Sequence, residues 1–304
     1  MSEAGAATFA WVPAGIVELH YWVVVERLVE VPNATSPPIG VRQSGFTRRK
    51  AVRHLREEAT MATISDPESV VIGRRFRGPN LSGNGGYTAG LLAGQFSFDS
   101  AVEVTLREPP PLEKHLDVVR ADNSARMMLA NILVAEARIA EQTPAPVAVV
   151  SMAQARNGMD RYARLGFHPF PNCFTCGPAR EEGDGLRIFP GPVSEGVVAS
   201  VWIPHPSLTD ERGAIPRPIV WAALDCPGGW SAITKERPMV LARMTARIDS
   251  APTVGEPHIV VGVLRRHDGR KSHVATTLFD ADRRVLAMTE QMWIAVDLDV
   301  FNRL

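Results

Sequence analysis

The sequence is poor in cysteine, in long apolar runs and in any excess of one charge. Only three of its 304 residues are cysteine, too few for a disulfide framework, so a reducing cytoplasm is the expected location. No apolar run approaches the roughly 18 residues of a membrane span. Glu3 and Glu18 stand where a secretory leader would be basic. We therefore expect neither a leader nor a membrane partner.

The charges balance. Lysine plus arginine equals aspartate plus glutamate, 33 of each, so no net field gathers nucleic acid or anionic lipid. Hydrophobic residues make up 45%, which is typical of a globular protein, and the length suffices for two ordinary domains. The composition argues against a nucleic-acid-binding protein and leaves a local anion site open.

Residues 1–60 match no regular pattern. Short apolar pieces alternate with prolines, and the basic patch Arg48–His54 is more typical of a solvated tail than of a nucleic-acid arm. We predict a poorly ordered N-terminal extension, with Met61 as the alternative start of the native protein because the first patterned segment follows it.

An apolar stretch in the second half, Ile219–Trp230, reaches a single carboxylate at Asp225 and then Pro227 and two glycines. Its apolar residues recur at helical spacing, which predicts a buried helix. A lone carboxylate there is costly to bury unless it has a partner or a catalytic role. Because proline lacks the N–H that a helix interior needs, we expect the helix to kink or stop at Pro227.

The stretch has a counterpart upstream. Gly83–Ala93 aligns with it when Leu92-Ala93 is set against Leu224-Asp225, an offset of 132 residues. The upstream copy has a glycine-rich helix start and no acid. The downstream copy has the acid and Pro216-Arg217-Pro218 in place of the glycines. Each copy therefore resembles half of a site.

Strand-like segments surround both predicted helices. Alternating or β-rich stretches and turn signals predict strands or hairpins at 70–73, 101–107, 125–140 (127–139 alternatively a helix), 144–155, 196–203, 240–248, Asp268-Gly269, 280–283 and 285–296. Both halves read β–loop–helix–β–β–β, which predicts an α+β architecture with a sheet around each helix. The two sheets are expected to pair edge to edge. The predicted units are 61–160 and 173–304, joined by a linker at 161–172.

Three features resemble the hotdog-fold acyl-CoA thioesterase superfamily in its fused, double-hotdog form. Cys173-Phe174-Thr175-Cys176-Gly177, with Gly185-Leu186 shortly after, is similar to a motif of many hotdog thioesterases. Asn84-Gly85-Gly86 resembles the family's His-Gly-Gly helix start, with Asn in place of His. Leu224-Asp225 resembles the helix acid that follows such a start. The resemblance covers about 66–297 and implies two tandem hotdog domains, each an antiparallel sheet wrapped around a long central helix.

The resemblance also implies one composite site between the two domains. Asn84, Gly85 and Gly86 would come from the first domain, with the glycine amides at the positive end of a helix stabilising the thioester oxygen. Asp225 of the second domain would act as general base or nucleophile. The alternatives are structural: a tight turn for the glycines and a helix-capping carboxylate for the acid.

The implied substrate is an acyl-CoA or similar thioester, with no cofactor and no metal. We assign Tyr87, Arg243 and Arg265 to substrate binding, the arginines because the phosphates of coenzyme A require cations; a solvated sheet face also explains them. Double hotdogs often pair again, so a homodimer is possible. Two alternative functions stay open: a catalytically silent acyl-CoA-binding protein, and an enoyl-CoA hydratase or dehydratase.

Cys173 and Cys176 have the spacing of metal ligands. A closed zinc site needs four ligands, and Cys226, His168 and His205 stand at no recognised spacing from the pair. We therefore predict a tight turn at the start of the second unit and a packed, unreactive Cys226.

Overall fold

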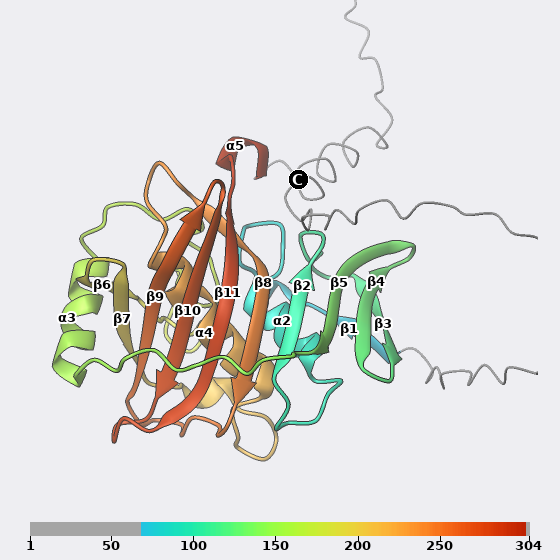
Figure 1. Cartoon of the computed structure of the whole chain (residues 1–304), viewed down its shortest axis with the longest axis horizontal. Coiled ribbons are helices and arrows are strands. Elements are labelled where there is room, and N and C mark those ends of the chain that lie inside the picture. The colour runs from blue at the N-terminus through green and yellow to red at the C-terminus, as the bar shows by residue number, and fades with distance from the viewer. Residues whose placement is uncertain (1–67, 302–304) are drawn as a thin grey trace, which may run out of the picture. The chain divides into compact units, whose positions relative to one another are not determined.

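The computed structural model describes residues 68–301. The predicted N-terminal extension and the Met61 start lie outside these residues. The strands are β1 (Glu68–Val71), β2 (Val102–Leu106), β3 (His115–Ala121), β4 (Ser124–Leu129), β5 (Ile132–Ile139), β6 (Gly191–Ser194), β7 (Val197–Trp202), β8 (Met239–Ile248), β9 (His258–Asp268), β10 (Lys271–Phe279) and β11 (Val285–Ala295). They form one sheet in the order β1-β3-β4-β5-β2-β8-β11-β10-β9-β7-β6 (Figure 1).

The strand order contains the same five-strand pattern twice. The first half runs β1-β3-β4-β5-β2 and the second runs β7-β9-β10-β11-β8. Along the chain, helix α2 (Gly85–Ala93) lies between β1 and β2, and helix α4 (Arg217–Trp230) lies between β7 and β8. The halves join where β2 pairs antiparallel with β8, from Val102↔Ala246 to Thr105↔Arg243. The predicted α+β fold of two tandem hotdog domains with edge-paired sheets is confirmed.

Both helices cover one face of this sheet, here called the inner face, and contact each other. The inner face is apolar: Met244 of β8, Val260 of β9 and Trp293 of β11 join Leu92 and Trp221 of the helices in one buried cluster. Every residue of α4 from Ile219 to Trp230 is buried. Burial of these large side chains supplies the main driving force for packing the helices on the sheet. Among the described residues, no helix is long and apolar enough to cross a membrane.

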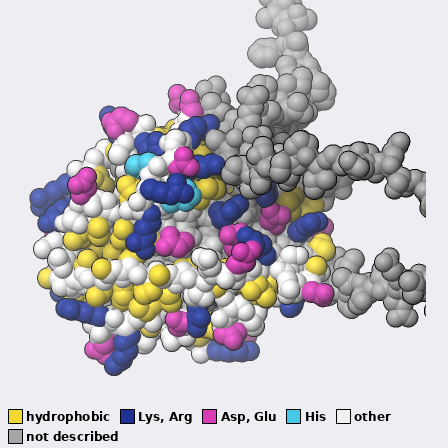
Figure 2. All heavy atoms as spheres, in the orientation of Figure 1, with side chains coloured by type: hydrophobic (Ala, Val, Ile, Leu, Met, Phe, Trp, Pro, Cys, Tyr) yellow, Lys and Arg dark blue, Asp and Glu magenta, His cyan; other side chains and the backbone are white. Residues whose placement is uncertain are grey.

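The opposite, outer face is crossed by residues 140–151, which run over the second half of the sheet to α3 (Met152–Tyr162) (Figure 1). The Val147 N–H donates to Thr277 Oγ1 of β10 at 2.9 Å. Val147 also joins Val261, Ala275 and Phe279 in a second buried cluster. Figure 2 shows hydrophobic side chains gathered in the region of this crossing, whereas charged side chains gather nearer the centre of the same face.

One secondary-structure prediction is wrong in this part of the chain. The 144–155 stretch is not a strand, because α3 begins at Met152 behind a capping box formed by Ser151 and Gln154. The β-rich prediction for 125–140 is confirmed and its helical alternative is wrong, because the stretch forms the β4–β5 hairpin, which turns at Ala130-Asn131. Strands β3 and β6 were not predicted. Because α3 packs on β6 and β7, we propose that the first repeat ends with β5 rather than at residue 160.

Of the two effects expected at Pro227, a kink or a stop, the stop does not occur. Helix α4 continues three residues beyond Pro227 to Trp230. One glycine on the sheet and one on the helix allow the last turn of α4 to pack closely on the sheet. A Cβ on Gly262 of β9 would lie within bonding distance of the Pro227 carbonyl, and a Cβ on Gly229 of α4 would lie 2.6 Å from the Trp293 ring. Tertiary packing of the last turn thus offsets the hydrogen bond that the proline cannot donate.

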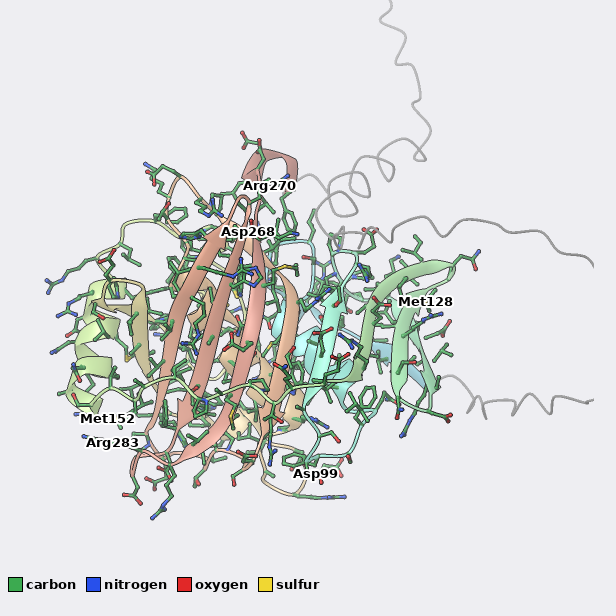
Figure 3. The ribbon with its side chains drawn as sticks, in the orientation of Figure 1. Asp99, Met128, Met152, Asp268, Arg270 and Arg283 are labelled. Carbon is green, nitrogen blue, oxygen red and sulfur yellow. The ribbon has the colours of Figure 1, made fainter. Side chains whose placement is uncertain are left out.

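The predicted hairpins of the second half are confirmed. Strands β9 and β10 pair antiparallel around Gly269, and β10 and β11 pair around the 280–284 turn. Figure 3 shows Asp268 and Arg270 at one end of the sheet and Arg283 at the other, as successive antiparallel hairpins require.

Candidate active site between the two helices

The start of α2 is fixed by Asn84, which is buried and caps the helix. Its Oδ1 accepts the Tyr87 N–H at 2.8 Å, which satisfies one of the amides that a helix start leaves unpaired. Gly86 faces α4 so closely that a Cβ there would lie 2.6 Å from the Asp225 Cβ. The glycine is therefore required for the approach of the two helices, whatever its chemical role.

Asp225 lies in the middle of α4 and points at this helix start. Its Oδ2 accepts the Gly86 N–H at 3.1 Å and an Asn84 Nδ2–H at 2.8 Å. The residue is 2% exposed, and its Oδ1 has no hydrogen-bond partner among the described residues. Burial, and secondarily the charge of Cys173, raises the pKa of Asp225 to about 7 against the opposing effect of its two donors. The structure thus brings Asn84, Gly86 and Asp225 into one hydrogen-bonded group.

Gly85 stands at the solvent side of this group. It is the first residue of α2 and is partly exposed, unlike Gly86. Within the described part of the chain, its N–H meets no hydrogen-bond acceptor. A free amide at the positive end of a helix favours an approaching negative oxygen.

Thr175 links this group to the second repeat and was not predicted as a site residue. Its hydroxyl donates to the Ala222 carbonyl at 2.8 Å and accepts from Asn84 Nδ2 at 3.3 Å. It sits in the predicted tight turn, which is confirmed by a 2.9 Å hydrogen bond from the Gly177 N–H to the Cys173 carbonyl. Its position inside the Cys-Phe-Thr-Cys-Gly motif was the available sequence signal.

Tyr87 lies one residue beyond the glycines, against the same turn. Its ring stacks on Phe76 with centroids 3.9 Å apart and meets Phe174 of the turn edge-on at 6.1 Å. Burial raises the pKa of Tyr87 to about 12, so it stays a neutral phenol. Tyr87 is partly exposed in the first turn of α2, and its role in substrate binding stays a prediction.

The two arginines assigned to substrate binding lie elsewhere. On β8, Met244 faces the helices, so its neighbour Arg243 points to the outer face, where it donates to Thr105 Oγ1 at 3.1 Å. On β9, Arg265 continues the odd-numbered series of outer-face residues, Val261 and Val263, and pairs with Glu290 at 3.4 Å. Asp225 belongs to α4, which covers the inner face, whereas both arginine side chains lie on the outer face. The sheet therefore separates the two arginines from Asp225.

The three cysteines converge, which their spacing did not show. Cys173 Sγ lies 3.6 Å from Cys226 Sγ, and all three sulfur atoms lie within 4.8 Å of one another. His168 Nε2 lies 3.5 Å from Cys176 Sγ. Hydrogen bonds from the other two thiols hold the pKa of Cys173 well below its usual range, whereas the pKa values of Cys176 and Cys226 are raised.

The described cavities lie away from Asp225. One of about 360 Å³ opens beside Trp230 at the end of α4, and one of about 490 Å³ lies on the outer face near Glu290. Neither is lined by Asn84, Gly86 or Asp225.

Comparison with known proteins gives structural neighbours alone. No protein-family model and no curated protein matches the chain. A protein of unknown function with a hot dog fold from Alicyclobacillus acidocaldarius is 11% identical, with a TM-score of 0.48, over 77% of this chain and 96% of that one. A tesB protein from Mycobacterium avium subspecies paratuberculosis is 10% identical, with a TM-score of 0.47 and the same coverage. A Streptococcus mutans protein bound to acetyl-CoA is 12% identical, with a TM-score of 0.32, over 34% of this chain and 83% of that one.

Proposed function

We propose that this protein hydrolyses acyl-CoA thioesters at the composite group formed by α2 and α4. The observation that carries the proposal is the pairing of the buried Asp225 with the helix start. One carboxylate oxygen is held by Gly86 and Asn84, and the other has no partner among the described residues. An unpaired buried oxygen costs about 1–3 kcal/mol, a cost that a catalytic role explains.

The chemistry follows from the positions of these groups. A water held by Asp225 Oδ1 gives up a proton as its oxygen attacks the thioester carbon. The carbonyl oxygen gains negative charge and is stabilised by the free Gly85 N–H at the positive end of α2. Collapse of this intermediate breaks the C–S bond, and the coenzyme A thiolate takes the proton. The products are a carboxylic acid and free coenzyme A.

Asn84 has the role of a positioning residue. Its amide donates to Asp225 Oδ2 and Thr175 Oγ1 while its carbonyl caps α2. Asn cannot exchange a proton as the His of related motifs would, so the acid–base work falls on Asp225 alone. Thr175 in turn anchors the group to the backbone of α4.

The test is turnover of an acyl-CoA panel, including medium and bulky acyl groups, with free coenzyme A separated by chromatography. Asp225→Asn keeps the shape of the side chain and removes the base, so we expect kcat to fall about 10²- to 10⁴-fold with little change in KM. The matched control is Asp99→Asn, an exposed carboxylate in the loop after α2, which should leave both constants unchanged. Full activity of Asp225→Asn would contradict the proposal.

One observation favours a silent acyl-CoA-binding protein instead. In the free protein the Gly86 N–H is already occupied by Asp225, so one of the two glycine amides is not available to a substrate oxygen. Binding of acyl-CoA without turnover, measured by calorimetry with the unmodified protein, would support that alternative.

A further inference from the structure

Three sulfur atoms from two parts of the chain meet beside the proposed active site. Cys173 and Cys176 come from the turn before β6, and Cys226 comes from α4. The residues are 4%, 3% and 6% exposed, and their Sγ atoms all lie within 4.8 Å of one another. These are all the cysteines of the chain. A chance meeting of all three in one buried cluster is a less economical explanation than a shared ligand.

The spacing of the sulfurs is that of ligands around one ion. Ligands on a tetrahedron around Zn²⁺, with Zn–S of about 2.3 Å, lie about 3.8 Å apart. Cys173 and Cys226 are separated by 3.6 Å, far longer than the roughly 2.05 Å of a disulfide. The cluster therefore needs only small adjustments to place three thiolates around a single centre.

The surroundings suit a buried negative sulfur cluster. Cys173 Sγ lies 3.6 Å from Cys226 Sγ, and the three sulfur atoms face one another in the buried cluster. Asn84 Nδ2 approaches Cys173 Sγ at 3.8 Å as a donor. Donors of this kind around metal-bound sulfur orient the ligands and offset their charge.

His168 acts as one of these donors and not as a fourth ligand. Its Nδ1 accepts the Phe170 N–H at 3.0 Å, so in the neutral ring the proton is on Nε2. Nε2 faces the carbonyl and the sulfur of Cys176, at 3.2 and 3.5 Å. A protonated nitrogen cannot coordinate a metal, and the protein thus offers three sulfurs and leaves the fourth position to water or a small anion.

We propose that Cys173, Cys176 and Cys226 bind one thiophilic d¹⁰ ion, Zn²⁺ or Cu⁺, through three thiolates. Soft sulfur ligands select these ions over Mg²⁺ or Ca²⁺. The ion would tie the turn that carries Thr175 to the helix that carries Asp225. Its role is therefore structural, and the proposal does not depend on which reaction the neighbouring carboxylate performs.

The first experiment measures metal content. The full chain is produced in medium supplemented with zinc or with copper, purified under reducing conditions without chelators, and analysed by elemental mass spectrometry. We expect about one bound ion per chain, since ligands this buried bind metal during folding. The metal found in each preparation distinguishes zinc from the cuprous ion. Fully reduced chains without metal from both media, or a Cys173–Cys226 disulfide, would overturn the proposal.

The second experiment counts the sulfur ligands in the unmodified chain, so it does not depend on variants that fail to fold. Chains produced with Cd²⁺ should show an ultraviolet sulfur-to-cadmium band with the intensity of three thiolate bonds. Cys226→Ser should lose the band, and His205→Gln, a histidine outside the cluster, should keep it. His168→Gln should retain one ion with about 10- to 100-fold weaker affinity. An intensity of one bond, or complete loss in His168→Gln, would contradict a three-thiolate site.

Discussion

The contact between α2 and α4 depends on two glycines one helical turn apart. At Gly86, an alanine Cβ would lie 2.6 Å from the Asp225 Cβ and 2.7 Å from the Trp221 carbonyl oxygen. At Gly90 it would lie 2.6 Å from the Pro218 Cα and 2.8 Å from the Trp221 Cβ. These atoms belong to the backbone or to the first side-chain carbon, so no rotamer change removes either clash. Alanine at either position must push the two helices apart.

The magnitude follows from two opposing effects. Overpacking costs typically about 1–3 kcal/mol, and the upper value applies because rigid atoms are in contact on both sides. Replacing glycine by alanine inside a helix returns up to about 1 kcal/mol. Each single variant should thus lose about 2 kcal/mol of unfolding free energy. One outward shift of α2 relieves both contacts, so the double variant should lose less than the sum of the two.

Thermal and urea unfolding of the two single variants and of the double variant measure these losses. For a unit of this size, about 2 kcal/mol corresponds to a fall in Tm of roughly 4–8 °C. Gly73→Ala is the matched control, because its Cβ would meet nothing closer than 3.9 Å and its φ of −67° suits alanine. Single variants as stable as the parent, or strictly additive losses in the double variant, would refute the shared-contact argument.

Two further predictions concern buried polar groups. Burial lowers the pKa of His258, whose Nε2 accepts the Thr253 N–H, so the neutral ring stabilises the fold above about pH 6.5. That stability should be lost as the pH falls through the lowered pKa, and His258→Asn should flatten this part of the profile of unfolding free energy against pH. Gln291 donates to the Leu224 carbonyl and accepts from the Trp293 indole, both at 2.7 Å. Gln291→Leu should cost about 3 kcal/mol in urea unfolding, because two buried partners are left unpaired; an unchanged midpoint would contradict this.

The sequence predicted the features that depend on periodicity. The repeat offset of 132 residues, drawn from Leu92-Ala93 and Leu224-Asp225, equals the separation of the helix starts at Gly85 and Arg217. Strand β8 and the two hairpins after it follow from alternation and turn residues. Patterns of this kind are visible because one face of each element is buried and the other is not.

The features that sequence missed depend on local exceptions or on tertiary contacts. The position of the β4–β5 turn was not predicted because Ala130 adopts a positive φ of 51°, a conformation for which glycine or asparagine is the usual sequence signal. Helix α3 was not predicted because the alternating valines before it favoured a strand, although Ser151 and Gln154 form a recognisable capping box. No local rule predicts that Cys226 lies beside Cys173 or that Thr175 donates to the backbone of α4, because these contacts form between segments that are distant in the chain.

The two half-sites of the fold, on α2 and on α4, are not equivalent, and the difference explains why the chain would have one reaction centre. The counterpart of Asp225 is Ala93 of α2, a fully buried residue with no ionisable group. The counterpart of the glycine start is Arg217, whose Nη1 donates to the Phe96 carbonyl at 3.0 Å and whose guanidinium lies 5.6 Å from the Phe98 ring centroid. A bulky cation thus occupies the helix start where Gly85 leaves an open amide. In a dimer of identical chains such a change would damage both sites at once, whereas in a fused pair the second half-site can be lost while the first is kept.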